Sequence, residues 1–229
     1  MSTTKIDSTL FDARAEIAMI SLPYGPIEKT RLKNPVNRAI KRSVDLLLGG
    51  VLALVSLPVL IPLLAIIIKL DTRGPVFFIQ KRTGLNMKTF YCIKFRTMKV
   101  NDDADRLQVQ PGDKRITKTG AFLRRYFLDE VPQLLNVLWG DMSLVGPRPH
   151  MLRHNIVYAR LIQNYHDRHK VKPGISGLAQ YRGYHGMINS KEDLVNRISS
   201  DIEYIENWTL FGDLFIFFST IVHVFKSLK

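Results

Sequence analysis

Residues 46–68 read LLLGGVLALVSLPVLIPLLAIII, and no charged side chain interrupts this stretch. At a rise of about 1.5 Å per residue, such a helix is long enough to cross roughly 30 Å of hydrocarbon. Pro58 and Pro62 fall near its middle, where each removes a backbone donor and clashes with the preceding turn, so we expect a bend there. Basic residues flank both ends, and if both flanks stay in the cytoplasm the segment must enter the membrane and return. An ordinary Pro-kinked crossing is the alternative, and the residues alone leave both open.

The net charge of the chain points to an anionic partner. The protein has 229 residues with a formal charge of +13, a length that fits one catalytic domain with a small appendage. Since an acid-free basic run directly precedes the apolar stretch, a membrane surface is favoured over a nucleic-acid groove, with a solvated linker as the alternative. Cys92 is the only cysteine, so no disulfide forms within the chain, as in a reducing compartment. The basic run comprises Lys29, Arg31, Lys33, Arg38, Lys41 and Arg42.

The rest of the chain predicts an α+β protein with three regions. We expect residues 1–36 to form a flexible N-terminal tail, 37–71 a re-entrant membrane helix hairpin, and 72–229 a mostly helical catalytic domain. Two β-rich runs at 76–82 and 89–98 predict a small β-hairpin, followed by a polar loop at 99–120. Helical patterns cover 120–138, 149–168 and 191–207, with a Gly/Pro loop at 172–177. Residues 208–224 predict an interfacial helix, with a buried core helix as the alternative.

Residues 129–149, DEVPQLLNVLWGDMSLVGPRP, concentrate the residues that chemistry needs. Asp129 alone is most simply a helix N-cap, because an apolar helix follows and a proline is tolerated in a first turn. A functional role for Asp129 is favoured because cationic side chains are expected near it. Arg124 lies just upstream, and Arg148 is held between two prolines. The loop from Gly174 to Gly177 can direct backbone amides at a phosphate.

Histidine spacing adds little to this site. His150 and His154 are four residues apart and could share a metal from one helix face, but no carboxylate motif accompanies them. A polar helix face is the favoured interpretation, and the same holds for His166 and His169. The sequence has no Walker loop, no Gly-x-Gly-x-x-Gly motif and no hydrolase triad order, so any nucleotide is bound by another device.

A set of motifs along residues 37–226 resembles the bacterial sugar transferases, the monotopic phosphoglycosyl transferases. Their order and spacing are highly specific. The motifs are KRxxD at 41–45, GP at 74–75, KFRTM at 94–98, LDE at 128–130, GDMSLVGPRP at 140–149 and VKPGISGLAQ at 171–180.

The resemblance implies transfer of a sugar-1-phosphate from a UDP-sugar to undecaprenyl phosphate, a polyprenyl phosphate lipid, with release of UMP. It also implies a re-entrant helix at the bacterial inner membrane, with the catalytic domain on the cytoplasmic face. Asp129 would be the nucleophile, and Glu130 its partner in metal binding or proton handling. Residues 181–186 are similar to the branch that transfers glucose-1-phosphate in exopolysaccharide synthesis. Substrate-binding roles are expected for Arg124, Arg148 and Asp201, all matched to family motifs.

The chemistry itself calls for cations around the nucleophile. A carboxylate approaching a diphosphate is repelled by about 4 kcal/mol per charge pair at 4 Å and an effective dielectric near 20. Mg²⁺ or another divalent cation, bound by Asp129 and Glu130, would offset this repulsion. Lys94, Arg96, Gly174 and Gly177 are further candidates for phosphate binding.

A second function is open on the residues alone. A membrane-anchored basic module that binds anionic lipid or nucleic acid without catalysis would explain the charge and the apolar anchor. It leaves the Asp129–Glu130 pair and the Arg148 turn without a role, so we expect a UDP-sugar and a lipid as partners and no nucleic acid. Formation of a homo-oligomer stays open.

Overall fold

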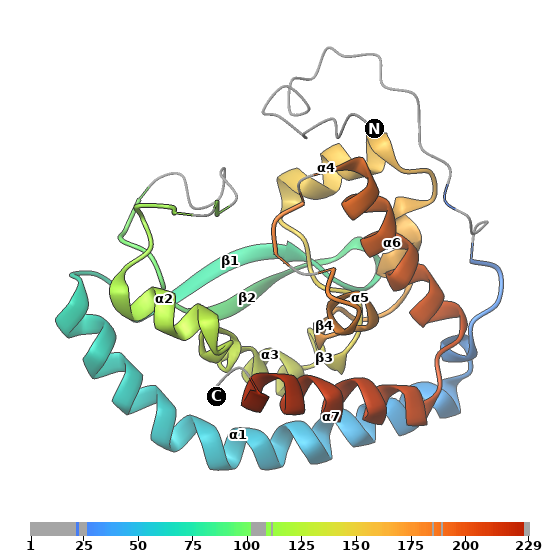
Figure 1. Ribbon diagram of the computed structural model, residues 1–229. Coiled ribbons are helices and arrows are strands. Elements are labelled where there is room, and N and C mark those ends of the chain that lie inside the picture. The colour runs from blue at the N-terminus through green and yellow to red at the C-terminus, as the bar shows by residue number, and fades with distance from the viewer. Residues whose placement is uncertain are drawn as a thin grey trace.

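The computed structural model describes residues 22, 27–101, 109–110, 112–184, 186–188 and 190–226. It is an α+β structure with a long apolar helix and small sheets, as predicted, and the helix lies along one side of the molecule (Figure 1). Most of the tail at residues 1–36 lies outside the described residues. In chain order the elements are η2 (Arg31–Lys33), α1 (Pro35–Asp71), β1 (Phe77–Thr83), η3 (Leu85–Met87), β2 (Thr89–Phe95), α2 (Lys118–Arg125), η4 (Leu128–Glu130), α3 (Gln133–Trp139), β3 (Ser143–Val145), α4 (Leu152–Leu161), η5 (Tyr165–Lys170), β4 (Gly174–Ser176), α5 (Leu178–Tyr181), α6 (Lys191–Glu206) and α7 (Leu210–Lys226).

Helix α1 is one continuous element rather than a hairpin of two helices. Its start is fixed by Asn34, whose side chain accepts from the Val36 backbone N–H, and by Pro35 in the first turn. Pro58 and Pro62 both lie inside the helix, which Figure 1 shows as a single arc. The predicted chain reversal within 37–71 is therefore not seen. A reversal needs a turn, and the residues around the two prolines are apolar side chains that favour helix.

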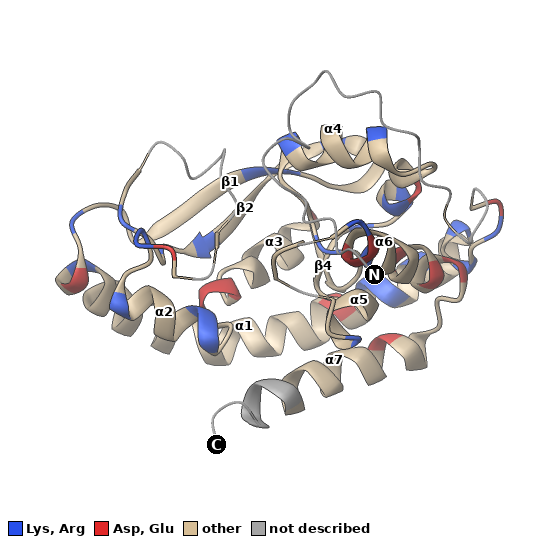
Figure 2. Ribbon diagram, turned by 45° about the horizontal axis from the view of Figure 1, so that its top comes forward, with Lys and Arg blue, Asp and Glu red and all other residues tan. Residues whose placement is uncertain are grey.

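One face of α1 packs on the domain and the other is exposed. Ala53, Leu57, Leu64 and Ile68 are buried, whereas the intervening leucines, valines and isoleucines are largely exposed. By length and composition α1 could cross a membrane, with a mean hydropathy of 2.9 in its most apolar window. Figure 2 shows that the middle of α1 carries no Lys, Arg, Asp or Glu. Such an apolar surface is expected of a helix that contacts lipid.

Two residues of the basic run serve the fold rather than a membrane surface. Lys41 is buried and pairs with Asp213 of α7 at 2.6 Å, and it also donates to the Val145 carbonyl at 3.0 Å. The Arg42 guanidinium donates to the carbonyls of Val137 and Leu138 near the end of α3. Only Lys29, Arg31, Lys33 and Arg38 of the run are exposed and so accessible to an anionic partner. The sequence did not reveal the contacts of Lys41 and Arg42, because their partners lie far along the chain.

The predicted hairpin is confirmed, and a second small sheet was missed. β1 and β2 pair antiparallel from Phe77 opposite Phe95 to Thr83 opposite Thr89. β3 and β4 form a parallel pair in which Ser143 lies opposite Gly174. The segment 172–177, predicted to be a loop, therefore contains a strand. Its three residues are too short for a period-2 pattern to reveal it.

Two of the three predicted helices are broken by residues in the left-handed conformation. The region 120–138 divides into α2, η4 and α3, because Phe127 has a φ of 56°. The region 149–168 divides into α4 and η5 at Asn164, which has a φ of 60°. The third prediction, 191–207, is confirmed as α6.

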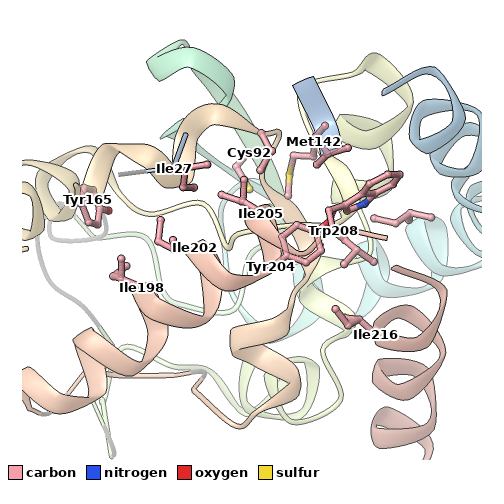
Figure 3. Packing of buried hydrophobic residues seen from close by; sticks show 14 of the residues in the cluster. Ile27, Cys92, Met142, Tyr165, Ile198, Ile202, Tyr204, Ile205, Trp208 and Ile216 are labelled. Atoms are coloured by element: carbon pink, nitrogen blue, oxygen red, sulfur yellow. The ribbon is translucent and has the colours of Figure 1, made fainter. Parts of the chain in front are cut away.

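The main core lies between α6, α3 and the small sheets. Ile198, Ile202 and Ile205 recur at helical spacing on α6 and join Cys92 and Met142 in one buried cluster (Figure 3). A smaller cluster joins Leu64 and Ile68 of α1 to Phe95 of β2 and Leu123 of α2. The two clusters fix α2 and β2 against α1, and these elements lead into the site.

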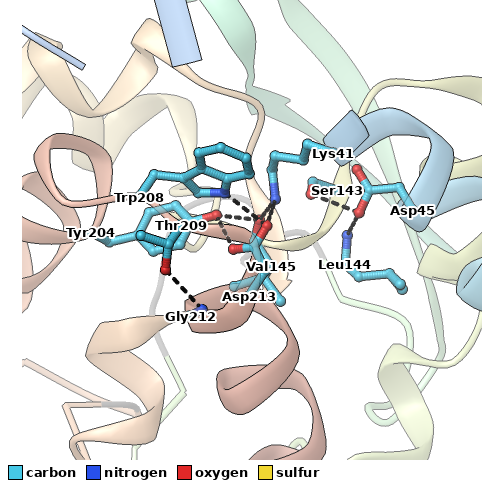
Figure 4. Close-up of polar contacts among 10 residues, drawn as sticks. All are labelled: Lys41, Asp45, Ser143, Leu144, Val145, Tyr204, Trp208, Thr209, Gly212 and Asp213. Atoms are coloured by element: carbon cyan, nitrogen blue, oxygen red, sulfur yellow. Dashed lines mark hydrogen bonds and ion pairs between the residues drawn. The ribbon is translucent and has the colours of Figure 1, made fainter. Parts of the chain in front are cut away.

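Helix α7 combines a buried anchor with an exposed aromatic face. Asp213 and Ile216 are buried, while Phe211, Phe215 and Phe218 are 84%, 57% and 54% exposed. Figure 4 shows Asp213 facing Lys41, Tyr204 and Trp208. Helix α7 therefore combines the two alternatives, a buried core helix and an interfacial helix: one face packs on the domain, and the other is suited to an interface.

Candidate active site

Asp129 and Glu130 lie in the short turn η4 between α2 and α3. The turn is set by Phe127, whose left-handed backbone is uncommon for a bulky residue and is a form of strain often found at functional sites. The N-cap interpretation of Asp129 is wrong: the cap position of α3 is Pro132, and no side chain caps that helix. Asp129 is nevertheless only 8% exposed. A buried carboxylate without a capping role needs another explanation.

Glu130 is held by two cations from different parts of the chain. Lys94 of β2 lies 2.5 Å from its Oε1. The Arg148 guanidinium donates to both carboxylate oxygens, at 2.5 and 3.1 Å. Burial opposes ionisation of Glu130, but the charges of Arg148 and Lys94 outweigh it and lower its pKa. Glu130 thus stays ionised and fixes Lys94 and Arg148 beside Asp129.

The Asp129 carboxylate, in contrast, has no hydrogen-bond partner among the described residues. Burial, supported by the neighbouring charge of Glu130, raises its pKa to about 6, against the opposing effect of Lys94, Arg124 and Arg148. The two adjacent acids therefore differ: one is neutralised by salt bridges, and the other is a poorly solvated carboxylate surrounded by cations. Pairs separated in this way are typical of acids with distinct chemical roles.

Arg124 and Asp201 reach the site in different ways. Arg124, on α2, donates from Nε to Thr97 Oγ1 at 2.7 Å, and burial lowers its pKa. Asp201 is 2% exposed and forms a salt bridge with Arg168, which in turn donates to the Arg148 carbonyl at 2.7 Å. Asp201 therefore supports the Arg148 turn from behind. Arg168 was missed because nothing in its local sequence marks it.

Three further candidates serve the fold where they were expected to bind phosphate. Arg96 donates to the carbonyls of Thr72 and Arg73 just past α1. The Gly174 N–H donates to the Pro147 carbonyl, so it is not directed at a ligand. A Cβ at Gly174 would lie 2.1 Å from Gly146 N, and one at Gly177 would lie 2.3 Å from Gly146 O. These glycines are needed because two chain segments pass at van der Waals distance beside the Arg148 turn.

A large cavity joins the acidic pair to α7. Its volume is about 1580 Å³, and we call it the catalytic cavity. Asp129, Glu130 and Arg148 line one part, and Phe211, Phe215 and Phe218 of α7 line another. A polar, cationic region and an apolar region thus share one space, which suits reactants of opposite polarity.

The residues do not form a metal cage. The described part of the chain contains no cluster of three or more His, Cys, Asp or Glu side chains. Mg²⁺ is commonly bound by one or two carboxylates together with substrate phosphates, an arrangement that needs no such cluster. The unpaired Asp129 carboxylate fits that role, whereas Glu130 is already engaged by Lys94 and Arg148.

Because the pKa of Asp129 is raised and that of Glu130 is lowered, neutralising each carboxylate should change the stability of the fold in opposite directions. Because the pKa of Asp129 is raised from 3.8 to about 6, its ionisation costs the fold stability as pH rises through that window. The cost is about 3 kcal/mol from the usual 1.36 kcal/mol per pKa unit. We expect Asp129→Asn to match wild type in thermal unfolding near pH 4 and to unfold several degrees higher at pH 7.5.

The matched control is Glu130→Gln, which leaves Lys94 and Arg148 without a counter-charge and should unfold at a lower temperature at pH 7.5. Thermal unfolding of the detergent-purified proteins measures both. A lower unfolding temperature for Asp129→Asn at pH 7.5 would contradict the account, because it would mean that the carboxylate stabilises the turn.

Comparison with known proteins identifies the family of this chain. Residues 36–227 match the family model described as bacterial sugar transferase. The UDP-glucose:undecaprenyl-phosphate glucose-1-phosphate transferase of Escherichia coli K12 is 44% identical over 91% of this chain and 45% of its own length. The exopolysaccharide production protein PSS of Rhizobium leguminosarum is 43% identical over 80% of this chain and 94% of its own length. A UDP-N-acetylgalactosamine-undecaprenyl-phosphate N-acetylgalactosaminephosphotransferase of Aeromonas hydrophila is 41% identical over 83% of this chain and 44% of its own length.

This chain spans less than half the length of several of these relatives. The smaller relative from Rhizobium, in contrast, is covered almost completely. The matched region of this chain contains α1 from its second residue, the Asp129–Glu130 turn, the Arg148 turn and all of α7. On this evidence the chain belongs to the bacterial sugar transferase family.

Proposed function

We propose that this chain transfers glucose-1-phosphate from UDP-glucose to undecaprenyl phosphate and releases UMP, as the first membrane step of exopolysaccharide or other surface glycan synthesis. The family and the names of several relatives support the reaction class and the sugar. The observation that carries the proposal is Asp129: a buried, unpaired carboxylate among cations, at the wall of a cavity with an apolar end.

The reaction proceeds by two displacements at one phosphorus atom. Asp129 attacks the β-phosphorus of UDP-glucose, the bond to the bridging oxygen breaks, and UMP leaves with that oxygen. An oxygen of the lipid phosphate then attacks the aspartyl phosphosugar, which frees Asp129 and forms the lipid diphosphate sugar. A pKa of about 6 keeps Asp129 mostly ionised near neutral pH, yet poorly solvated and so reactive. A soluble donor and a membrane-bound acceptor can thereby use one site in turn.

The cations make the first attack feasible. Arg148 and Lys94 lie within salt-bridge distance of Glu130, the residue next to the nucleophile. Arg124 opposes the pKa rise of Asp129 through its charge. Fixed cations in a site shielded from water stabilise the charge that develops on the phosphoryl oxygens. Glu130 serves this purpose by orienting two of them.

A divalent cation, Mg²⁺, is proposed as the cofactor. Asp129 would hold it together with the diphosphate, and when bound it would neutralise charge on the phosphate oxygens. The protein residues do the remaining work: Lys94 and Arg148 orient the diphosphate, and the cavity walls exclude water.

The contacts at both ends of α1 support a re-entrant placement at the cytoplasmic face of the inner membrane. Before α1, the Ile27 N–H donates to Asp167 at 2.7 Å, and Thr30 Oγ1 donates to the Ile205 carbonyl at 2.6 Å. After α1, Arg96 binds the carbonyls that follow the helix. Since both flanks contact the same domain, a helix that simply crossed the membrane would have to break one set of contacts. The arc of α1 would instead dip into one leaflet and return.

The non-catalytic alternative, a basic anchor for anionic lipid or nucleic acid, has less support. Two residues of its basic run, Lys41 and Arg42, are used inside the protein. It also gives no role to the strained turn that carries Asp129.

Release of UMP from a panel of UDP-sugars tests the function. Purified protein with undecaprenyl phosphate and Mg²⁺ should release UMP fastest from UDP-glucose. The Asp129→Asn variant should release UMP slower by orders of magnitude while it stays folded. UDP-galactose and UDP-N-acetylgalactosamine are the informative competitors. Preference for an acetylated sugar would overturn the assignment of glucose as the transferred sugar but leave the proposed reaction class intact. The absence of UMP release with every donor would overturn the function.

Cysteine accessibility tests the membrane placement. In a Cys92→Ser background, Lys29→Cys and Lys88→Cys put thiols at exposed positions on the two sides of α1. Both should resist an impermeant thiol reagent in intact cells and react after permeabilisation, because both lie in the cytoplasm. Labelling of one site alone in intact cells would show that α1 crosses the membrane.

A further inference from the structure

Four polar side chains that line the catalytic cavity have no part in the proposed mechanism. Each of them carries one buried atom without a hydrogen-bond partner in the described part of the chain. Such atoms are rare in folded proteins, because a polar atom that is cut off from water and has no hydrogen-bond partner is costly. Several of them around one cavity indicate that a ligand supplies the missing partners. The atoms are His150 Nε2, Ser176 Oγ, Gln180 Oε1 and Arg197 Nε.

The hydrogen bonds behind His150 decide which of its nitrogens is free to accept. The Tyr165 hydroxyl donates its proton to Asn155 Oδ1 at 2.5 Å, and Asn155 Nδ2 donates to Thr83 Oγ1 at 2.6 Å. The Tyr165 oxygen can therefore only accept from His150 Nδ1, which lies 2.7 Å away. The proton is thus on Nδ1. Burial also keeps the pKa of His150 well below 6.5, so the ring is neutral and Nε2 presents a lone pair.

Gln180 presents a second acceptor. Its Nε2 donates to the Ile175 carbonyl at 3.0 Å, which fixes the amide orientation and leaves Oε1 as the unpartnered atom. The diphosphate oxygens of a nucleotide sugar carry no proton near neutral pH and cannot satisfy either acceptor. The ligand groups that meet His150 Nε2 and Gln180 Oε1 must therefore donate. These donor groups are not the diphosphate, whose oxygens accept hydrogen bonds and can bind Lys94, Arg124 and Arg148.

We infer that His150 Nε2 accepts a hydrogen bond from a donor group on the uncharged part of the nucleotide sugar and so helps to set donor specificity, with Tyr165 as the residue that positions it. This inference rests on the proposed function. The chemistry required is an O–H or N–H donor, and UDP-glucose offers it in two places: the glucose hydroxyls and the uracil N3–H. Arg197, which also lines the catalytic cavity, offers its Nε–H as a donor to an acceptor on the same ligand.

Donor analogues test the role of His150 and identify the group it contacts. The set comprises UDP-glucose, analogues that each lack one glucose hydroxyl, and UDP-glucose methylated at uracil N3. Wild type should lose about tenfold in kcat/KM with the analogue that lacks the contacted donor, the scale of one hydrogen bond. His150→Phe should show that loss already with UDP-glucose, mainly in KM, and no further loss with that analogue.

A deoxysugar as the affected analogue identifies a sugar hydroxyl, and the N3-methyl compound identifies the base. If each analogue lowers kcat/KM relative to UDP-glucose by the same factor in His150→Phe as in wild type, the inference is overturned. If wild type releases no UMP from UDP-glucose, the proposed function fails instead, so the two failures are distinguishable.

Two further variants separate a specific role from a structural one. Tyr165→Phe removes only the oxygen that holds Nδ1–H and should weaken discrimination against the same analogue, which keeps the inference testable if His150→Phe does not fold. His169→Phe is the matched control: His169 is also a buried histidine beside Tyr165, but it does not line the catalytic cavity. It should leave the ranking of donors unchanged. Equal effects of the His150 and His169 variants on that ranking would overturn the assignment.

Discussion

The buried ion pair between Lys41 and Asp213 is the contact on which the arrangement of this protein depends. Asp213 also accepts from Tyr204 and Trp208, and Lys41 also donates to the Val145 carbonyl. One carboxylate therefore joins α1, α6 and α7, and its partner adds β3 (Figure 4). Removal of either charge would leave the other buried and uncompensated, at a cost of about 3–5 kcal/mol. Helix α1 and the rest of the domain are therefore one cooperative unit rather than a helix tethered to a separate domain.

The same helix also positions the catalytic segment. One turn beyond Lys41, Asp45 accepts from the Ser143 hydroxyl and the Leu144 N–H, both at 2.9 Å. These residues and Val145 form β3, which leads within three residues to Arg148. Arg148 then fixes Glu130 beside Asp129. A short chain of direct contacts thus links α1 to the turn that carries Asp129, so the fold sets the position of the proposed nucleophile relative to the apolar face of α1.

The sequence predicted the elements whose structure depends on residues that are close together in the chain. The hairpin follows from two runs rich in β-branched and aromatic residues that are joined by a turn, and the apolar run fixes α1. The convergence of Asp129 with Arg148 was predictable because a Gly-Pro-Arg-Pro turn lies close in sequence. The salt bridge to Lys94 and the support of Arg148 by Arg168 were not, since they join residues far apart in the chain. Asp213 did leave a signal: a lone acid in an apolar helix implies a buried cation, but the sequence did not identify Lys41.

The central claim is that Asp129 forms a covalent bond to the sugar phosphate, and mass spectrometry of the trapped enzyme tests it most directly. Protein incubated with UDP-glucose and Mg²⁺ without lipid acceptor, then quenched and digested, should carry a hexose phosphate on the peptide that contains Asp129. One UMP should be released per adduct, and undecaprenyl phosphate should discharge it. UMP release only when the lipid is present, with no adduct, or an adduct on Glu130, would contradict the account.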